Sequence, residues 1–242
     1  MTQPLARAIQ KMKAAKRIVA FTGAGVSQES GVPTFRDHNG LWENHRFEEV
    51  ATPEGFQADP VLVWRFYMAR RQLAKQVKPN AAHLAIAGWE KQFSFAGVVT
   101  QNIDGLHAQA GSRHVQELHG NIWKTECSRC HRVEVNEATE LSADLPHCRD
   151  CGGLLRPHVV WFGEALNESV VHEALLWLYQ ADVIIVIGTS GAVEPAASFV
   201  REAKQKGAYV IEINTQKTAL TPFVDLTLYG KSAELLGGPL RI

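Results

Sequence analysis

The sequence lacks both an excess of charge of either sign and any long hydrophobic run. Lysine and arginine number 25 together, as do aspartate and glutamate, so the formal charge is zero. Without a long basic block, sequence-independent binding to nucleic acid is disfavoured. The longest strongly apolar run, VIIVIG at 183–188, is far shorter than the roughly 20 residues that span a bilayer. We therefore expect neither nucleic acid nor a membrane among the partners.

The N-terminal segment also lacks the long apolar stretch and small-residue cleavage site of a secretory signal. A cytoplasmic location is the expectation that remains. The chain has 242 residues, of which 45% are hydrophobic. That is enough to fill the core of one large domain with a smaller one inserted in it.

The glycine-rich loop in IVAFTGAGVSQESG, at 18–31, lacks part of the dinucleotide-binding fingerprint. That fingerprint needs G-x-G-x-x-G after a strand and an acidic residue about 20 residues later. Gly23 and Gly25 are present, but Gln28 stands where the third glycine belongs, and residues 33–60 carry prolines and glycines that suit loops. The loop is predicted to bind phosphates, though not as in an ordinary dehydrogenase. Taken alone, it is equally compatible with a plain strand-to-helix turn.

Four apolar runs predict strands at 17–25, 95–104, 182–191 and 209–216. Their apolar residues are continuous rather than alternating, which is typical of parallel strands covered on both faces. Helices are predicted between them and at the N-terminus, at 2–16, 60–77, 80–91, 168–180 and 194–206, with Pro195 in the first turn of the last. This alternation predicts an α/β fold with an open parallel sheet of Rossmann type.

Ligands of such sheets bind beyond the carboxyl ends of the strands. For any one polar residue there, ordinary loop polarity is an equal alternative, but four such loops together favour a site. The residues predicted along this rim are Gly23, Ala24, Gly25, Gln101, Asn102, Asp104, Gly188, Thr189, Ser190 and Asn214.

The only four cysteines form two C-x-x-C pairs separated by 17 residues, namely Cys127, Cys130, Cys148 and Cys151. This spacing predicts one zinc ion bound by four thiolates. Disulfides would need an oxidising compartment, which nothing in the sequence supports. His131 and His147 could replace a thiolate, but the regular pairs favour sulfur. A shell of four thiolates leaves no open position, so the zinc is expected to be structural.

Six motifs in order together resemble the sirtuin family, over about residues 17 to 216. They are GAGVSQESGVPTFRD at 23–37, TQNIDGLH at 100–107, ELHG at 117–120, the paired C-x-x-C, RPHVVWFGE at 156–164 and GTS at 188–190. The resemblance implies a protein-lysine deacylase that consumes NAD as a cleaved co-substrate. It implies a Rossmann-like NAD-binding domain from 1–36, 81–120 and 158–242, a helical module with the acyl pocket at 37–80, and a zinc-ribbon module at 121–157.

In the implied reaction, nicotinamide leaves C1′ of the ribose and the carbonyl oxygen of an acyl-lysine attacks that carbon. A histidine then activates a ribose hydroxyl, which captures the acyl carbon. The products are free lysine, nicotinamide and O-acyl-ADP-ribose. By resemblance, His119 is this base and Asn102 is a second catalytic residue, and a pKa near neutrality suits the base.

The resemblance also implies which residues contact NAD. Asn102 and Asp104 would hold the ribose and the nicotinamide carboxamide, and Gln101 a ribose hydroxyl. Arg36 would face the phosphates, for which its donor fork is apt, and Phe35 would cover the reacting ribose, with a core aromatic as the alternative. The other implied contacts are Gly23, Ala24, Gly25, Glu29, Thr34, Ile103, His119, Gly188, Thr189, Ser190, Asn214 and Thr215.

The acyl-lysine peptide is expected to pair its backbone with an extended stretch from Val159 to Phe162, in the manner of strand addition. The residues expected to contact it there are Val159, Val160, Trp161, Phe162 and Gly163.

Acyl selectivity is assigned to a predicted helix that carries Tyr67 and Arg70. Three residues apart, they share a face, and they could grip a carboxylate. A solvated helix face is the alternative. With Ala51, they resemble the class III branch of sirtuins, whose acyl pocket takes succinyl- and malonyl-lysine and whose members can also remove acetyl groups.

The sequence leaves three other functions as alternatives. A zinc-containing NAD-dependent dehydrogenase should show the missing glycine and ribose-binding acid. A zinc-ribbon interaction module would need no NAD site. Protein ADP-ribosylation remains a third alternative, within the same family.

Overall fold

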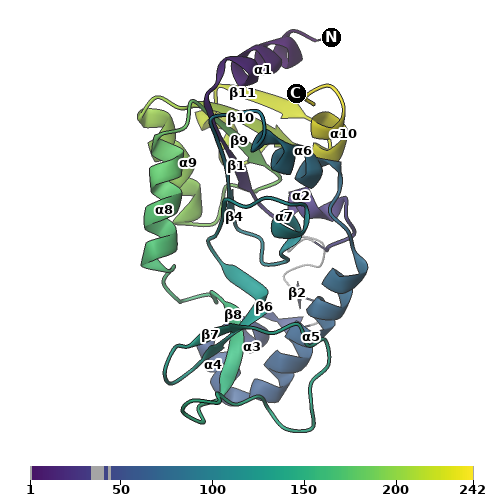
Figure 1. Ribbon diagram of the computed structural model, residues 1–242, viewed down its shortest axis with the longest axis vertical. Helices are drawn as coiled ribbons and strands as arrows, with labels where there is room; N and C mark the ends of the chain where they lie inside the picture. Colours follow the sequence, from purple (N-terminus) through teal and green to yellow (C-terminus); the bar gives the residue numbers. More distant parts are fainter. Residues whose placement is uncertain (1, 34–40, 43–44, 242) are drawn as a thin grey trace.

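The computed structural model describes residues 2–33, 41–42 and 45–241 (Figure 1). Its larger sheet has six parallel strands in the order β11-β10-β9-β1-β4-β5. Their bounds are β1 Arg17–Thr22, β4 Phe95–Thr100, β5 Val115–Glu117, β9 Val183–Ile187, β10 Tyr209–Asn214 and β11 Leu226–Tyr229. The chain proceeds from β1 to β4 and β5, then returns to the other side of β1 with β9. The strand order therefore reverses beside β1, and ligands bind at such a switch point.

Helices cover both faces of this sheet (Figure 1). One face packs against α1 (Gln3–Ala14), α6 (Ala81–Trp89) and α10 (Ser232–Gly237), and the other against α8 (Glu168–Tyr179) and α9 (Ala196–Gln205). Within β1, Ile18 and Ala20 join the first core, whereas Val19 and Phe21 join the second. Successive side chains of a strand point to opposite faces, so this double covering explains why the strand sequences are continuously apolar.

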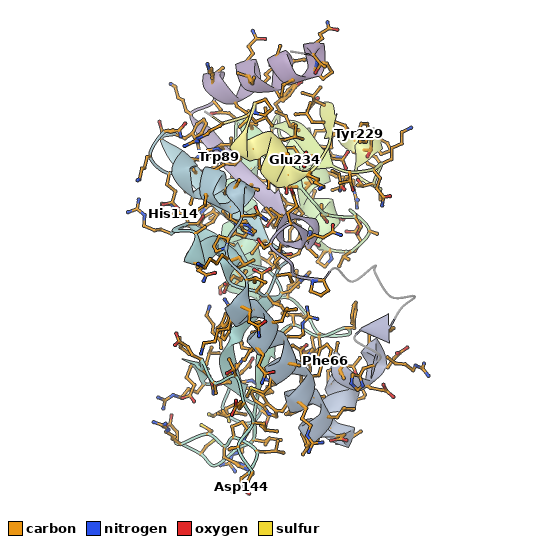
Figure 2. All side chains as sticks on the ribbon, turned by 90° about the vertical axis from the view of Figure 1, so that its right-hand side faces the viewer. Phe66, Trp89, His114, Asp144, Tyr229 and Glu234 are labelled. Carbon is orange, nitrogen blue, oxygen red and sulfur yellow. The ribbon has the colours of Figure 1, made fainter. Side chains whose placement is uncertain are left out.

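A smaller sheet lies in the lower part of Figure 1, with the antiparallel order β7-β6-β8. Its strands are β6 Gly120–Cys127, β7 Val133–Val135 and β8 Leu155–Val159. Helices α3 (Phe47–Val50), α4 (Pro53–Ala58) and α5 (Pro60–Gln76) belong to the same part of the molecule, as does the two-residue pair β2 (Leu41–Trp42) and β3 (His45–Arg46). Figure 2 shows Phe66 of α5 in this lower part.

This smaller part has its own core, in which α5 packs against β6 and β8 through Trp64, Tyr67 and Ile122. Arg71 of α5 is fully buried, and its guanidinium donates hydrogen bonds to the carbonyl oxygens of Ile122 and Ala138, at 2.5 and 2.9 Å. The bonds fix the helix that carries Tyr67 and Arg70 to β6 and to the loop that follows β7.

The four predicted strands and five predicted helices are confirmed, with ends that differ by a few residues. Pro195 precedes the first residue of α9 instead of standing in its first turn. The remaining described elements are α2 (Gly25–Gln28), α7 (Leu106–Gln109) and a 3₁₀ turn at Thr221–Phe223. Within the described ranges, no helix is both long enough and apolar enough to cross a bilayer.

Candidate active site

A cavity of about 1150 Å³ runs from the carboxyl ends of the parallel strands to the smaller part of the molecule. Most residues predicted for NAD, catalysis and the acyl-lysine line it together. They are Gly23, Ala24, Gly25, Gln101, Asn102, Ile103, Asp104, His119, Gly188, Thr189, Ser190, Asn214 and Thr215, with Ala51, Tyr67, Arg70, Val159, Val160, Trp161, Phe162 and Gly163.

Glu29 is the exception among the described residues, because it does not line this cavity. It lines an adjoining cavity of about 430 Å³, where its carboxylate accepts hydrogen bonds from the hydroxyl of Ser232 and the backbone N–H of Ala233, at 3.0 and 2.8 Å. Glu29 thus fixes the start of α10 to α2. Thr34, Phe35 and Arg36 lie outside the described residues.

The glycine-rich loop after β1 packs directly on the loop after β9. The backbone N–H of Gly25 donates to the carbonyl oxygen of Gly188 at 2.8 Å. A Cβ atom added to Gly25 would lie 2.7 Å from the Gly188 Cα, closer than real Cβ atoms come. Gly188 itself has a φ of +59°, the left-handed region that favours glycine. Both glycines are therefore required to bring the loops after β1 and β9 together.

At the next strand end, a buried polar network holds the side chains of Asn102 and Asp104. The hydroxyl of Ser27 donates to the Asp104 carboxylate at 2.8 Å and accepts from the Asn102 amide at 3.1 Å. Burial raises the pKa of Asp104, while hydrogen bonds from Leu106 and Ser27 and the charge of Arg70 oppose that rise. The carboxyl group is thus held rigidly at the cavity wall.

Two buried histidines that the sequence did not single out lie behind this network. Ser27 contacts His83 Nε2 at 3.4 Å, and Thr22 contacts His107 Nε2 at 2.9 Å. The two rings are 4.8 Å apart. Burial lowers the pKa of His83 to about 4 and that of His107 to about 3, the latter with a smaller contribution from His83. Both rings are therefore neutral at neutral pH.

His119 follows β5 and is half-buried at the cavity wall. Burial lowers its pKa, and a hydrogen bond with the Gln101 carbonyl partly offsets this. A neutral imidazole facing a cavity can accept a proton from a bound hydroxyl.

Polar groups converge at the end of the cavity beside β9 and β10. The Gln101 amide donates to the Thr189 hydroxyl at 3.0 Å, and the Asn214 amide donates to the Thr189 carbonyl oxygen at 2.8 Å. These bonds tie three strand ends into one polar wall that suits the hydroxyls and ring nitrogens of a nucleoside.

The stretch expected to pair with a peptide is only partly a strand, because β8 ends at Val159. The next three backbone N–H groups donate within the protein: Val160 to the His119 carbonyl at 2.9 Å, Trp161 to the Glu164 carboxylate at 2.8 Å, and Phe162 to the Ala51 carbonyl at 3.0 Å. These three donors are therefore not available to a peptide, and the expected pairing with this stretch stays a prediction for its other backbone groups. The three bonds fix the loop to the site instead.

The cavity wall also includes residues that the sequence analysis missed. On α8 these are Glu168, Val171, His172 and Leu175, and in α2 they are Ser27 and Gln28. The α8 residues belong to none of the motifs, so only the fold brings them to the site.

The four cysteines form a single cluster at the base of the smaller sheet, with all sulfurs within 4.8 Å of one another. The Sγ atoms of Cys127 and Cys151 are 3.4 Å apart, and those of Cys130 and Cys148 are 3.7 Å apart. Four sulfurs held tetrahedrally at the usual zinc distance would be about 3.8 Å apart. The backbone N–H groups of Arg129 and Cys130 point at the Cys127 sulfur, as expected for a thiolate. The donor set and the spacing fit zinc.

The model of the Sir2 family matches residues 23–195 of this chain. Among curated proteins, an NAD-dependent protein deacylase from Thermococcus sibiricus is 50% identical over 225 residues, covering 90% of this chain and 88% of the relative. Another NAD-dependent protein deacylase, from Pyrococcus furiosus, is 50% identical over 223 residues, covering 90% of this chain and 89% of the relative.

Three solved structures extend the comparison. A mutant Sir2 homologue in complex with ADP-ribose is 43% identical with a TM-score of 0.93, covering 100% of this chain and 96% of that chain. A Sir2 homologue in complex with NAD is 44% identical with a TM-score of 0.92, covering 98% and 92%. A Sir2 mutant with a p53 peptide and NAD is 30% identical with a TM-score of 0.83, covering 98% and 96%.

Proposed function

We propose, on the premise that this chain belongs to the Sir2 family and is an NAD-dependent protein deacylase, that its acyl pocket selects lysines with succinyl or malonyl groups and also accepts acetyl. The family assignment establishes the deacylase activity and NAD as co-substrate. The acyl preference is the proposal, and it rests on three residues of the cavity wall, Ala51, Tyr67 and Arg70.

The residues present fit NAD. The adenosine half of NAD needs hydroxyl and amide partners, which Thr189 and Asn214 offer at one end of the cavity. The nicotinamide half needs a partner for its carboxamide, which Asn102 and Asp104 offer at the other end. NAD supplies a ribose–nicotinamide bond whose cleavage drives removal of the acyl group. In our proposal the Gly23–Gly25 loop carries its phosphates, and Asn102 and Asp104 orient its nicotinamide end.

We assign His119 the role of general base. It lines the same cavity as Asn102, and burial keeps its imidazole neutral at neutral pH. Its ring would take the proton of a ribose hydroxyl, which raises the nucleophilicity of that oxygen toward the acyl carbon. Ile103 and Val160 line the same cavity with apolar side chains, which would limit the access of water to this step.

The acyl preference is supported by charge and by size. Arg70 brings a guanidinium to the cavity wall and Tyr67 a hydroxyl, and both groups can donate hydrogen bonds to a carboxylate. Burial raises the pKa of Tyr67 to about 12, so the hydroxyl keeps its proton over the working pH range. Ala51 has only a methyl side chain and is buried at the same wall, which leaves room for an acyl chain longer than acetyl.

The test is Arg70→Met, assayed by mass spectrometry with NAD and one peptide that carries acetyl-, succinyl-, malonyl- or glutaryl-lysine. A charge-assisted hydrogen bond is worth roughly 1.5–3 kcal/mol, or about 10–150-fold. We expect succinyl-lysine turnover to fall by about that factor, mainly through KM, while acetyl-lysine turnover is spared. Arg65→Met is the matched control, because Arg65 is an exposed arginine on the same helix.

The structure also supplies the competing role for Arg70, since its charge opposes the rise that burial causes in the pKa of Asp104. If Arg70→Met slows acetyl and succinyl substrates equally, Arg70 serves Asp104 and the acid-acyl preference fails, while the deacylase assignment stands. The relatives' names favour neither alternative of the sequence analysis, dehydrogenation or protein ADP-ribosylation.

A further inference from the structure

Tyr67 receives a hydrogen bond from the loop that follows β8. The indole Nε1 of Trp161 donates to the Tyr67 hydroxyl oxygen at 3.0 Å, and both side chains are buried. Among the residues that the structure describes, this is the one hydrogen bond found for that oxygen, so no described group accepts the hydroxyl proton. The bond joins the predicted peptide-binding loop to the predicted acyl pocket.

The direction of this bond fixes the orientation of the tyrosine proton. An indole N–H only donates, so Trp161 must take a lone pair of the hydroxyl oxygen. Conjugation with the ring keeps the phenolic proton near the ring plane, which leaves it two orientations. The indole N–H occupies one of these two sides of the oxygen. Repulsion between the indole hydrogen and the phenolic hydrogen therefore favours the orientation in which the phenolic hydrogen lies on the other side. The Tyr67 hydroxyl is then a donor pointing away from Trp161.

Trp161 is itself held on several sides. The Arg156 guanidinium stacks on the indole at 3.5 Å from the ring centroid and makes a two-bond ion pair with Glu164, at 2.5 and 2.8 Å. The Glu164 carboxylate also accepts the Trp161 backbone N–H at 2.8 Å. Phe56 packs on the indole with a centroid distance of 5.3 Å. The indole N–H is thus aimed by a rigid loop.

We propose that Trp161 is a positioning residue for acyl selectivity, which turns the Tyr67 hydroxyl so that it donates to the carboxylate of an acidic acyl group. The inference rests on the proposed preference for succinyl- and malonyl-lysine and adds a residue that would act through Tyr67. An acetyl group has no carboxylate to receive this bond. Loss of the indole N–H should therefore lower turnover of succinyl-lysine more than that of acetyl-lysine.

The experiment removes the N–H with two variants. Trp161→Phe keeps an aromatic ring, and replacement of Trp161 by benzothienylalanine, which has sulfur in place of the indole N–H, keeps the shape. We expect the ratio of kcat/KM for succinyl- to acetyl-lysine peptide to fall about 2- to 12-fold, the worth of one neutral hydrogen bond, with the change in the succinyl KM. The same benzothienylalanine replacement at Trp64 is the matched control, because that indole donates to the Leu155 carbonyl in the same core.

A double variant separates action through Tyr67 from other effects. In a Tyr67→Phe background, Trp161→Phe should leave the succinyl-to-acetyl ratio unchanged, since no hydroxyl remains to be oriented. If Trp161→Phe and the isostere lower both activities equally, or lower the ratio again in that background, the inference is overturned and the acyl preference is untouched. If Tyr67→Phe itself leaves the ratio unchanged, the role of Tyr67 in the proposed preference fails and this inference fails with it.

Discussion

Nδ1 of His119 lies 3.0 Å from the carbonyl oxygen of Gln101. A carbonyl oxygen only accepts hydrogen bonds, so the ring must carry its proton on Nδ1. In the neutral ring, Nε2 then has a free lone pair and is the basic nitrogen. The residue that precedes Asn102 thereby sets the tautomer that a general base at this position requires.

Replacement of His119 by alanine should lower deacylation about 10²- to 10⁴-fold, the usual contribution of a positioned general base. Exchange of labelled nicotinamide into NAD needs only the steps before the hydroxyl is activated, so it should be reduced less. Both rates can be measured on one preparation with an acetyl-lysine peptide. Near-normal deacylation by the variant would show that another group is the base.

The acid limb of the pH profile provides a second test of the same residue. Burial lowers the pKa of His119 below its ordinary value, and the Gln101 bond only partly restores it. In our assignment the neutral ring is the active form, so the midpoint of the acid fall in kcat/KM for acetyl-lysine should lie below about pH 6.5, the ordinary histidine value. An apparent pKa clearly above that value would contradict this assignment.

Removal of zinc should abolish activity indirectly. The cluster is part of the smaller core, in which Cys127 is fully buried and Cys148 nearly so. Cys148→Ser, or stripping by a strong chelator, should therefore unfold the β6–β8 sheet and disturb α5 with it. Metal analysis of the native protein should give about one zinc per chain. Full activity of a protein shown to be metal-free would rule out this structural role.

The sequence predicted the central strands because both of their faces are buried, which leaves a continuous apolar signal. It missed β5 and β11, which lie at the two edges of the sheet. Their sequences, VQE and LTLY, are short and partly polar, since an edge strand is less enclosed. The pattern of apolar residues therefore reveals whether a strand is buried on both faces more readily than whether it pairs with a neighbouring strand.

The site was predictable where a motif follows a strand directly, as at Gly23 and Asn102. It was not predictable where the role depends on a distant partner. Glu29 stands in the glycine-rich motif, yet its carboxylate binds the start of α10, about 200 residues later. His83 belongs to none of the motifs and His107 only ends one of them, and it is the fold that buries their rings together.

Two glycine substitutions should have opposite effects. In Gly25→Ala the new Cβ would meet the backbone of Gly188 at 2.7 to 2.8 Å, so one of the two loops must move. We expect a rise in the KM for NAD and a loss of about 1–3 kcal/mol of stability, as for other overpacked sites. Gly88→Ala is the control, because Gly88 lies within helix α6 and its nearest neighbour is 4.0 Å away. Gly88→Ala should raise the free energy of unfolding by about 0.5–1 kcal/mol. An unchanged KM for NAD in Gly25→Ala would show that the loop contact is dispensable.

The buried pair His83 and His107 should make the fold unstable in mild acid. Their pKa values are about 4 and about 3 in the folded protein, against about 6.5 in an unfolded chain. Between about pH 6.5 and 4 the unfolded state therefore binds more protons, and the free energy of unfolding falls as the pH falls. Each histidine contributes up to about 1.4 kcal/mol per pH unit in this window and nothing above about pH 7.5.

Urea denaturation at several pH values from 7.5 to 5 measures this slope directly. His107→Gln keeps a polar side chain but removes one titrating group, so it should reduce the slope by roughly half of what the pair contributes. Glu126 also titrates in acid, because hydrogen bonds with His158 and His131 lower the pKa of its carboxylate to about 2. The stability that it contributes is lost only below about pH 4.5, outside the range of this experiment. A wild-type slope in His107→Gln would mean that His107 binds as many protons in the folded as in the unfolded protein, which contradicts a pKa lowered by burial.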